Sequence, residues 1–86
     1  YKDYDILIEG HTDNVPFSNA TLQDNWGLSA MRSVAVARYM QNQLMVDPAR
    51  ITAGARSEFV PKASNLTPEG RSMNRRTEII ILPKLE

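Results

Sequence analysis

The chain of 86 residues contains no cysteine, one histidine and one tryptophan. The absence of cysteine excludes disulfide bonds, zinc–thiolate sites and a thiol nucleophile. It is compatible with an oxidising or a reducing compartment and therefore locates nothing by itself. No uninterrupted apolar run is longer than Ile79–Leu82, which is far too short to cross a membrane.

An excess of charge of one sign is also lacking, because ten basic residues balance ten acidic ones. No net field favours nucleic acid or an anionic membrane surface, so nucleic acid is not expected as a partner. Arg71, Arg75 and Arg76 form a basic cluster that is too small for a nucleic-acid footprint. The length allows a single domain with a modest core.

Hydrophobic periodicity predicts an α/β fold with the order strand, helix, strand, short helix and strand. Asp5–Glu9 is expected to be a strand with a buried centre, and residues 11–24 form a long polar loop of the kind that usually carries function. Asn25 or Asp24 can cap a long helix that is expected to run to about Met45, and a cap is the favoured role of Asn25.

The second half of the chain continues this alternation. The segments expected there are a helical turn at Pro48–Arg50, a strand at Ile51–Ala55, a helix at Pro68–Met73 and a strand at Thr77–Leu82. Thr67 is placed to cap the short helix, because proline follows it at the first helical position. The helical crossover predicts that the first two strands run parallel, whereas periodicity leaves the direction of the last strand open.

Apolar residues of the long helix recur on one side, as in a helix that packs through one face. They are Leu28, Met31, Ala35, Val36, Tyr39, Met40 and Leu44. Arg32 lies within this stripe. Its charge either reaches solvent at the edge of the stripe or is held by a ligand or an acidic partner.

The most informative pattern is a carboxylate after the first strand and an arginine in the first turns of the helix. Asp13 ends the segment His11-Thr12-Asp13, and Arg32 follows Asn25-Trp26 and Leu28-Ser29. The carboxylate can take an ammonium group, and the guanidinium can take a carboxylate with two hydrogen bonds. This pair therefore suits a small zwitterionic ligand. No nucleophile and base accompany it, which favours binding over catalysis.

Several short motifs together carry a family resemblance. They are Ile8–Pro16, Asn25-Trp26 with Leu28-Ser29 and Arg32, Asp47-Pro48, Ala53-Gly54, Glu58, Pro61, Asn65, Glu69–Arg71 and Asn74–Ile79. Over about residues 5–83, the chain resembles the OmpA-like peptidoglycan-binding domain. The Asn-Val-Pro and Asn-Trp segments look most like the MotB type of this domain.

The resemblance implies a two-layer α/β sandwich with a mixed sheet and non-catalytic binding of cell-wall peptidoglycan. Asp13 would hold the ammonium group of meso-diaminopimelate in the stem peptide, and Arg32 would clamp a carboxylate of the same ligand. Leu28 would flank the ligand, Asn25 would shape the pocket, and Thr12 would order the loop or contact the ligand. No cofactor, metal or catalytic residue is implied.

Asn74, Arg75 and Arg76 are further candidate ligand-binding residues. One of the two arginines would face the ligand or the glycan, and the other would pair with an acid such as Glu78 or Glu9. A solvated charge cluster is the alternative interpretation of this segment.

Two other conspicuous side chains receive mainly structural interpretations. Trp26 could stack on a sugar ring or a peptide, but packing beneath the loop is favoured. His11 has no serine, cysteine or acidic partner in register, so a structural role is favoured over catalysis.

The resemblance places the domain in the periplasm, with a parent protein anchored in the outer membrane or elsewhere in the envelope. The family domain normally begins with a further strand and helix, so residues 1–86 are expected to correspond to its later two-thirds. An open sheet edge and self-association, including a homodimer, are therefore expected. The alternatives are a flagellar-stator-type wall anchor and a wall-peptide hydrolase, which would need a metal triad or a nucleophile and base in register.

Overall fold

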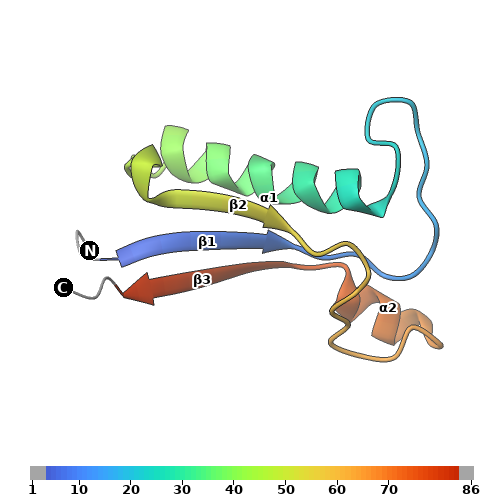
Figure 1. Ribbon diagram of the computed structural model, residues 1–86. Helices are drawn as coiled ribbons and strands as arrows, with labels where there is room; N and C mark the ends of the chain where they lie inside the picture. The colour runs from blue at the N-terminus through green and yellow to red at the C-terminus, as the bar shows by residue number, and fades with distance from the viewer. Residues whose placement is uncertain (1–3, 84–86) are drawn as a thin grey trace.

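The computed structural model describes residues 4–83, which form a three-stranded sheet with a long helix on one face and a short helix at one end (Figure 1). The elements are β1 (Tyr4–Gly10), α1 (Asn25–Asn42), the 3₁₀ turn η1 (Pro48–Arg50), β2 (Ile51–Ala55), α2 (Pro68–Asn74) and β3 (Thr77–Pro83). The predicted domain of residues 1–86 includes residues 1–3 and 84–86, which lie outside the described part. No helix within residues 4–83 has the length and apolarity to span a bilayer.

The sheet is mixed and has the strand order β2-β1-β3. β1 runs parallel to β2, with Ile8 opposite Ala53, and antiparallel to β3, with Ile8 opposite Ile79. The predicted α/β class, parallel first pair and mixed sheet are confirmed. In Figure 1, β1 ends near the long loop and α2, whereas its start and the end of β3 lie at the other end of the sheet.

Small polar residues, rather than the predicted apolar stripe, form the buried face of α1. Ser29 and Ser33 are fully buried, whereas Met31 and Tyr39 of the stripe are 44% and 58% exposed. The cause is the close approach of the helix to Gly10, where an added Cβ would lie 2.0 Å from the backbone oxygen of Ser29. Large side chains do not fit between these backbones, so the sequence prediction of the packing face was wrong.

Local hydrogen bonds set the ends of α1. Asp24 is the N-cap, because its side chain accepts from the Gly27 amide at 3.1 Å, and Asn25 is the first helical residue rather than the cap. The helix ends at Asn42 instead of near Met45, whose φ of 58° lies in the left-handed region and cannot continue a right-handed helix. The other predicted boundaries agree with the structure to within one residue.

The short helix α2 begins as predicted. The Thr67 hydroxyl accepts from the Gly70 amide at 3.0 Å, and Pro68 occupies the first helical position. Arg71 lies inside this helix and Arg75 caps its end. Because residues four apart share one side of a helix, the two arginines face the same region.

Candidate functional site

A cavity of about 290 Å³ lies at the carboxyl end of β1, between the following loop, the first turns of α1 and the end of α2. Its lining residues are Thr12, Asp13, Val15, Pro16, Phe17, Asn25, Leu28, Arg32, Arg71 and Arg75. Six of the predicted ligand-binding residues are among them, so distant parts of the sequence meet at one site. Asn74 and Arg76, the other two, do not line it.

Backbone hydrogen bonds fix the segment that leaves β1. The His11 amide donates to the Arg76 carbonyl at 2.8 Å, and the Thr12 amide donates to the Ser57 carbonyl at 2.8 Å. The Thr12 hydroxyl donates to the Asp13 carbonyl at 2.8 Å. These contacts tie the start of the loop to β3 and to the segment after β2, which holds Asp13 in a defined position.

Asp13 is buried, with 6% of its surface exposed. Its Oδ1 accepts from the Val15 amide at 3.1 Å, and its Oδ2 accepts from Arg75 Nη1 at 2.6 Å. A carboxylate has about four acceptor positions, so these two contacts leave capacity for a cation in the cavity. The ion pair with Arg75 orients the carboxylate.

Arg32 provides a free positive charge at the same cavity. Its side chain is half-buried in the second turn of α1 and makes no hydrogen bond or ion pair with any described residue. The Arg71 guanidinium donates to the Asn65 carbonyl at 2.9 Å. The cavity lining therefore carries the carboxylate of Asp13 and the guanidiniums of Arg32, Arg71 and Arg75. This balance favours a ligand with more than one carboxylate.

Asn25 and Leu28 complete the side of the cavity that belongs to α1. Asn25 is buried, and its Nδ2 donates to the Val15 carbonyl at 3.2 Å, which holds the loop against the helix. The Asn25 Oδ1 is buried without a hydrogen-bond partner among the described residues. Leu28 is half-buried and contributes apolar surface.

Asn74 lies outside the cavity lining. The prediction that it contacts ligand does not agree with its geometry. It is fully buried. Its Oδ1 accepts from the amides of Lys62 and Ala63, and its Nδ2 donates to the Ala63 carbonyl and to Asn65 Oδ1. Both donors and both acceptor positions of the amide are used, so Asn74 fixes the loop before α2.

Arg76 turns away from the cavity. Its Nε donates to Glu78 Oε2 at 2.5 Å, and its Nη2 donates to the Val60 carbonyl at 3.1 Å. The hydrogen bond from Arg76 lowers the pKa of Glu78. The two arginines therefore have separate surroundings: Arg75 lies at the cavity and Arg76 pairs with an acid, so the prediction of a ligand contact for Arg76 does not agree with the structure.

His11 is buried beside the site but does not line the cavity. Its Nε2 lies 3.7 Å from Glu9 Oε1 and 3.7 Å from Glu78 Oε2, and neither ring nitrogen has a hydrogen-bond partner among the described residues. Burial, followed by the charge of Arg76, lowers the pKa of His11. Within residues 4–83, no group of His, Asp and Glu side chains is arranged to hold a metal ion.

Sequence reasoning did not identify Arg71 or the turn from Val15 to Phe17 as parts of the cavity. The spacing of Arg71 and Arg75 on one helix is a signal that could have found the first. The turn gave no such signal, because its position depends on the hydrogen bonds that Asp13 and Asn25 make to Val15.

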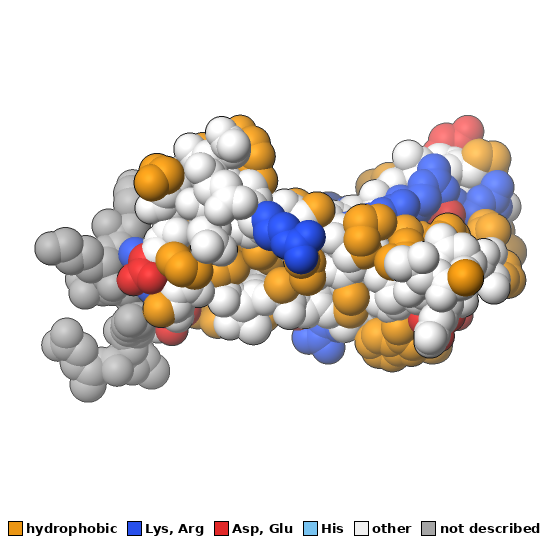
Figure 2. Space-filling view, turned by 90° about the horizontal axis from the view of Figure 1, so that it is seen from above, with side chains coloured by type: hydrophobic (Ala, Val, Ile, Leu, Met, Phe, Trp, Pro, Cys, Tyr) orange, Lys and Arg blue, Asp and Glu red, His pale blue; other side chains and the backbone are white. Residues whose placement is uncertain are grey.

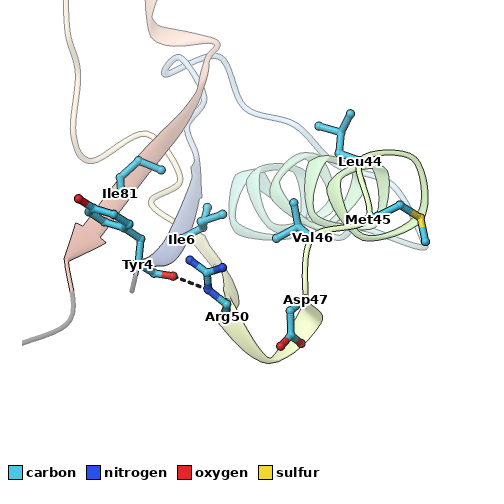
Figure 3. A pocket seen from close by; sticks show the side chains of 8 residues that line it. All are labelled: Tyr4, Ile6, Leu44, Met45, Val46, Asp47, Arg50 and Ile81. Carbon is cyan, nitrogen blue, oxygen red and sulfur yellow. Dashed lines mark hydrogen bonds between the residues drawn. The ribbon is translucent and has the colours of Figure 1, made fainter. Parts of the chain in front are cut away.

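A larger cavity of about 700 Å³ lies at the other end of the sheet, and Figure 3 shows it from close by. Apolar side chains such as Ile6, Val46 and Ile81 form much of its lining, and the Arg50 Nε donates to the Tyr4 carbonyl at 2.6 Å. None of the predicted ligand-binding residues lies there. The charged cavity is therefore the better candidate for the site.

The fold and this cavity define a small α/β domain with a charged cavity beside the end of its central strand. The sequence profile of the OmpA family matches residues 1–75, and the chain belongs to this family.

Similar proteins extend beyond the length of this chain. Motility protein B of Bacillus subtilis (strain 168) is 46% identical over 79 residues, which cover 92% of this chain and 30% of that protein. The cell wall anchor of the T6SS from Pseudomonas aeruginosa is 37% identical with a TM-score of 0.82, and the match covers 94% of this chain and 55% of that one. The periplasmic domain of Helicobacter pylori MotB is 26% identical with a TM-score of 0.88, and the match covers 99% and 54%. The chain thus spans about a third to a half of these relatives.

Proposed function

We propose that this domain binds cell-wall peptidoglycan through a stem peptide that contains meso-diaminopimelate, and that it thereby anchors an envelope protein to the wall without catalysis. The observation that carries the proposal is the placement of Asp13 and the unpaired Arg32 on one cavity. Family membership and the similarity to a cell wall anchor support it.

The chemistry of the ligand matches the charges of the cavity. The side-chain end of meso-diaminopimelate carries an ammonium and a carboxylate on one carbon. The ammonium would contact the free acceptor positions of Asp13, and the carboxylate would receive two hydrogen bonds from Arg32. Arg71 and Arg75 add positive charge for the further carboxylates of a stem peptide.

The proposed setting is the periplasm, because one similar structure is a periplasmic domain and another is a wall anchor. Attachment of the parent protein to the outer membrane stays a prediction. A flagellar-stator-type wall anchor is the second candidate, and the similarity to motility protein B favours it. A wall-peptide hydrolase is disfavoured, because His11 lies outside the cavity and no nucleophile with an adjacent base lines it.

The proposal is tested by titrating the protein with two synthetic stem peptides that differ only at the third residue, meso-diaminopimelate or lysine. The lysine peptide lacks the second carboxylate and leaves Arg32 without its partner. A lost hydrogen bond to a charged group costs about 1.5–3 kcal/mol, so binding should weaken about tenfold to a hundredfold. Equal affinities, or no measurable binding of the diaminopimelate peptide, would contradict the proposal.

A further inference from the structure

A second groove, of about 230 Å³, lies beside the charged cavity. Pro16, Phe17 and Asn25 line both, so the two are separated only by a shared wall. The remaining lining of the second groove comes from Asn14 in the loop after β1, from the start of α1 and from the turn after β2. A ligand bound in one cavity therefore lies next to the other.

An exposed aromatic pair forms part of this groove. The rings of Trp26 and Phe59 have centroids 5.6 Å apart and planes tilted by 38°. Trp26 is 50% exposed and Phe59 is 64% exposed, so the expectation that Trp26 packs beneath the loop was wrong. The pair keeps a large apolar surface open to solvent, next to polar groups of the same groove.

The turn that carries Phe59 is held in a strained conformation. Ser57 has a φ of 52°, in the left-handed region that a serine seldom adopts. Its amide donates to the Ser29 hydroxyl at 3.2 Å, and its carbonyl accepts from the Thr12 amide at 2.8 Å. The same contacts fix the loop of the charged cavity, so the aromatic pair and Asp13 are positioned by one network.

The polar groups of the groove differ in sign from those of the charged cavity. Asp24 and Glu58 are its ionisable residues, and no lysine, arginine or histidine lines it. Asp24 uses one carboxylate oxygen to cap α1, and the side chains of Asn14 and Glu58 make no hydrogen bond with any described residue. Carboxylate and amide groups accept hydrogen bonds from hydroxyl and amide donors, and they repel an anionic ligand.

We propose that this groove binds an N-acetylated hexosamine ring of the glycan strand, while the charged cavity holds the stem peptide, an inference that rests on the proposed function. The apolar face of a pyranose ring would lie on Trp26 and Phe59, and its hydroxyl and acetamido groups would bond to Asn14 and Glu58. The glycan carries the stem peptide covalently, so two neighbouring cavities match the two linked parts of the ligand.

The test compares two probes: the free diaminopimelate tripeptide, and the same tripeptide attached to its N-acetylglucosaminyl–N-acetylmuramyl disaccharide. Calorimetry should show about fivefold to tenfold tighter binding of the disaccharide peptide, which is the scale of one aromatic contact. Trp26 is the only tryptophan of the chain. Its fluorescence should shift with the disaccharide peptide and stay nearly constant with the free peptide.

Phe59→Ala removes half of the aromatic surface and keeps the tryptophan reporter. It should abolish the gain from the disaccharide and leave the affinity for the free peptide unchanged. Tyr39→Ala is the matched control. Tyr39 is a 58% exposed aromatic residue of α1, the helix that carries Trp26, and it lies outside both cavities. Circular dichroism verifies that each variant folds, and Phe59→Leu replaces Phe59→Ala if the latter does not.

The outcomes separate this inference from the proposed function. Equal affinities for the two probes, with an unchanged tryptophan signal, would overturn the glycan site and leave the peptide site intact. Loss of free-peptide binding alone, with a tryptophan response to the disaccharide peptide, would contradict the proposed function and support the glycan site. Binding of neither probe would overturn both.

Discussion

The two ends of the sheet are built on different principles. At the carboxyl end of β1, polar residues are buried and bonded: Asp13, Asn25 and Asn74 each hold a loop through their side chains. At the other end, Leu44 and Ile81 are large apolar residues that are 56% and 51% exposed. In Figure 2, several lysine and arginine side chains lie at the end away from the grey termini and others lie near the middle, while apolar side chains are spread over the face.

The difference shows where this fold needs defined geometry. A buried polar group that lacks a hydrogen bond costs free energy, so a network of bonded groups allows few arrangements. Apolar packing tolerates more variation. The charged end is therefore suited to hold a ligand in one orientation, and the apolar end is suited to contact with another surface. The predictions that follow test this contrast.

Removing a charge at the polar end should have the largest effect. Arg32→Ala should weaken binding of the diaminopimelate peptide by about 2–5 kcal/mol, as expected for one partner of a desolvated charge pair. Asp13→Asn should have a similar effect, because an amide keeps the bond from Val15 but loses the charge. Arg38→Ala, an exposed arginine of the same helix outside the cavity, is the control. The measurement is calorimetry on folded variants. Wild-type affinity in both Arg32→Ala and Asp13→Asn would contradict the account.

Adding a methyl group where β1 and α1 approach each other closely should destabilise the fold. Gly10→Ala places a Cβ 2.0 Å from the Ser29 backbone oxygen, whereas the nearest atoms to a Cβ at Gly54 lie 3.9 Å away. Overpacking costs about 1–3 kcal/mol and occasionally more, so Gly10→Ala should lower the urea midpoint strongly. Gly54→Ala, in the neighbouring strand opposite Glu9, should change it little. Equal midpoints for the two variants would show that the helix can move away.

Acid should destabilise the polar end through His11. Since burial lowers its pKa, the folded protein binds fewer protons at this group than the unfolded chain, and stability falls as pH drops below the ordinary value of 6.5. Replacement by leucine should flatten the loss of thermal stability between about pH 7.5 and pH 5.5, a range above the ordinary value of 4.5 for Glu78. An unchanged pH profile in His11→Leu would rule out this role.

A polar substitution at the apolar end should have the smallest effect on stability. Ile81→Lys should change the free energy of unfolding by less than about 0.5 kcal/mol, as at most exposed positions. Ile8→Val, in the fully buried centre of the sheet, should cost about 0.5–1.5 kcal/mol. If the apolar end mediates self-association, as the open sheet edge predicts, Ile81→Lys should also make gel-filtration elution independent of concentration. A variant that associates like the wild type would exclude this surface.

The order of elements could be predicted from the sequence because local signals agree at each boundary. The apolar centre of β1, the β-branched run of β3 and the Thr67-Pro68 start of α2 placed those elements to within one residue. The buried face of α1 could not be predicted in this way. Ser29 and Ser33 are buried because the helix approaches Gly10 closely. This distance depends on tertiary structure, and the periodicity of the sequence does not reveal it.

The site divides along the same line. Asp13 and Arg32 were predicted from motifs and do line one cavity. Asn74 has a side chain that could contact a ligand, but its amide makes hydrogen bonds to the loop before α2. Trp26 was expected to be covered, and only the position of the Ser57 turn explains its open pairing with Phe59. Sequence motifs thus indicate which residues belong to the site, and long-range hydrogen bonds decide the role of each.

The central claim is that the polar end, and not the larger apolar cavity, receives the stem peptide. Amide chemical shifts of the labelled protein, followed by NMR during titration with the diaminopimelate tripeptide, test it directly. The account predicts that the shifts concentrate at Thr12, Asp13 and Leu28, with Tyr4 and Ile81 unaffected. Shifts that concentrate around Ile81 and leave the loop after β1 unchanged would contradict it.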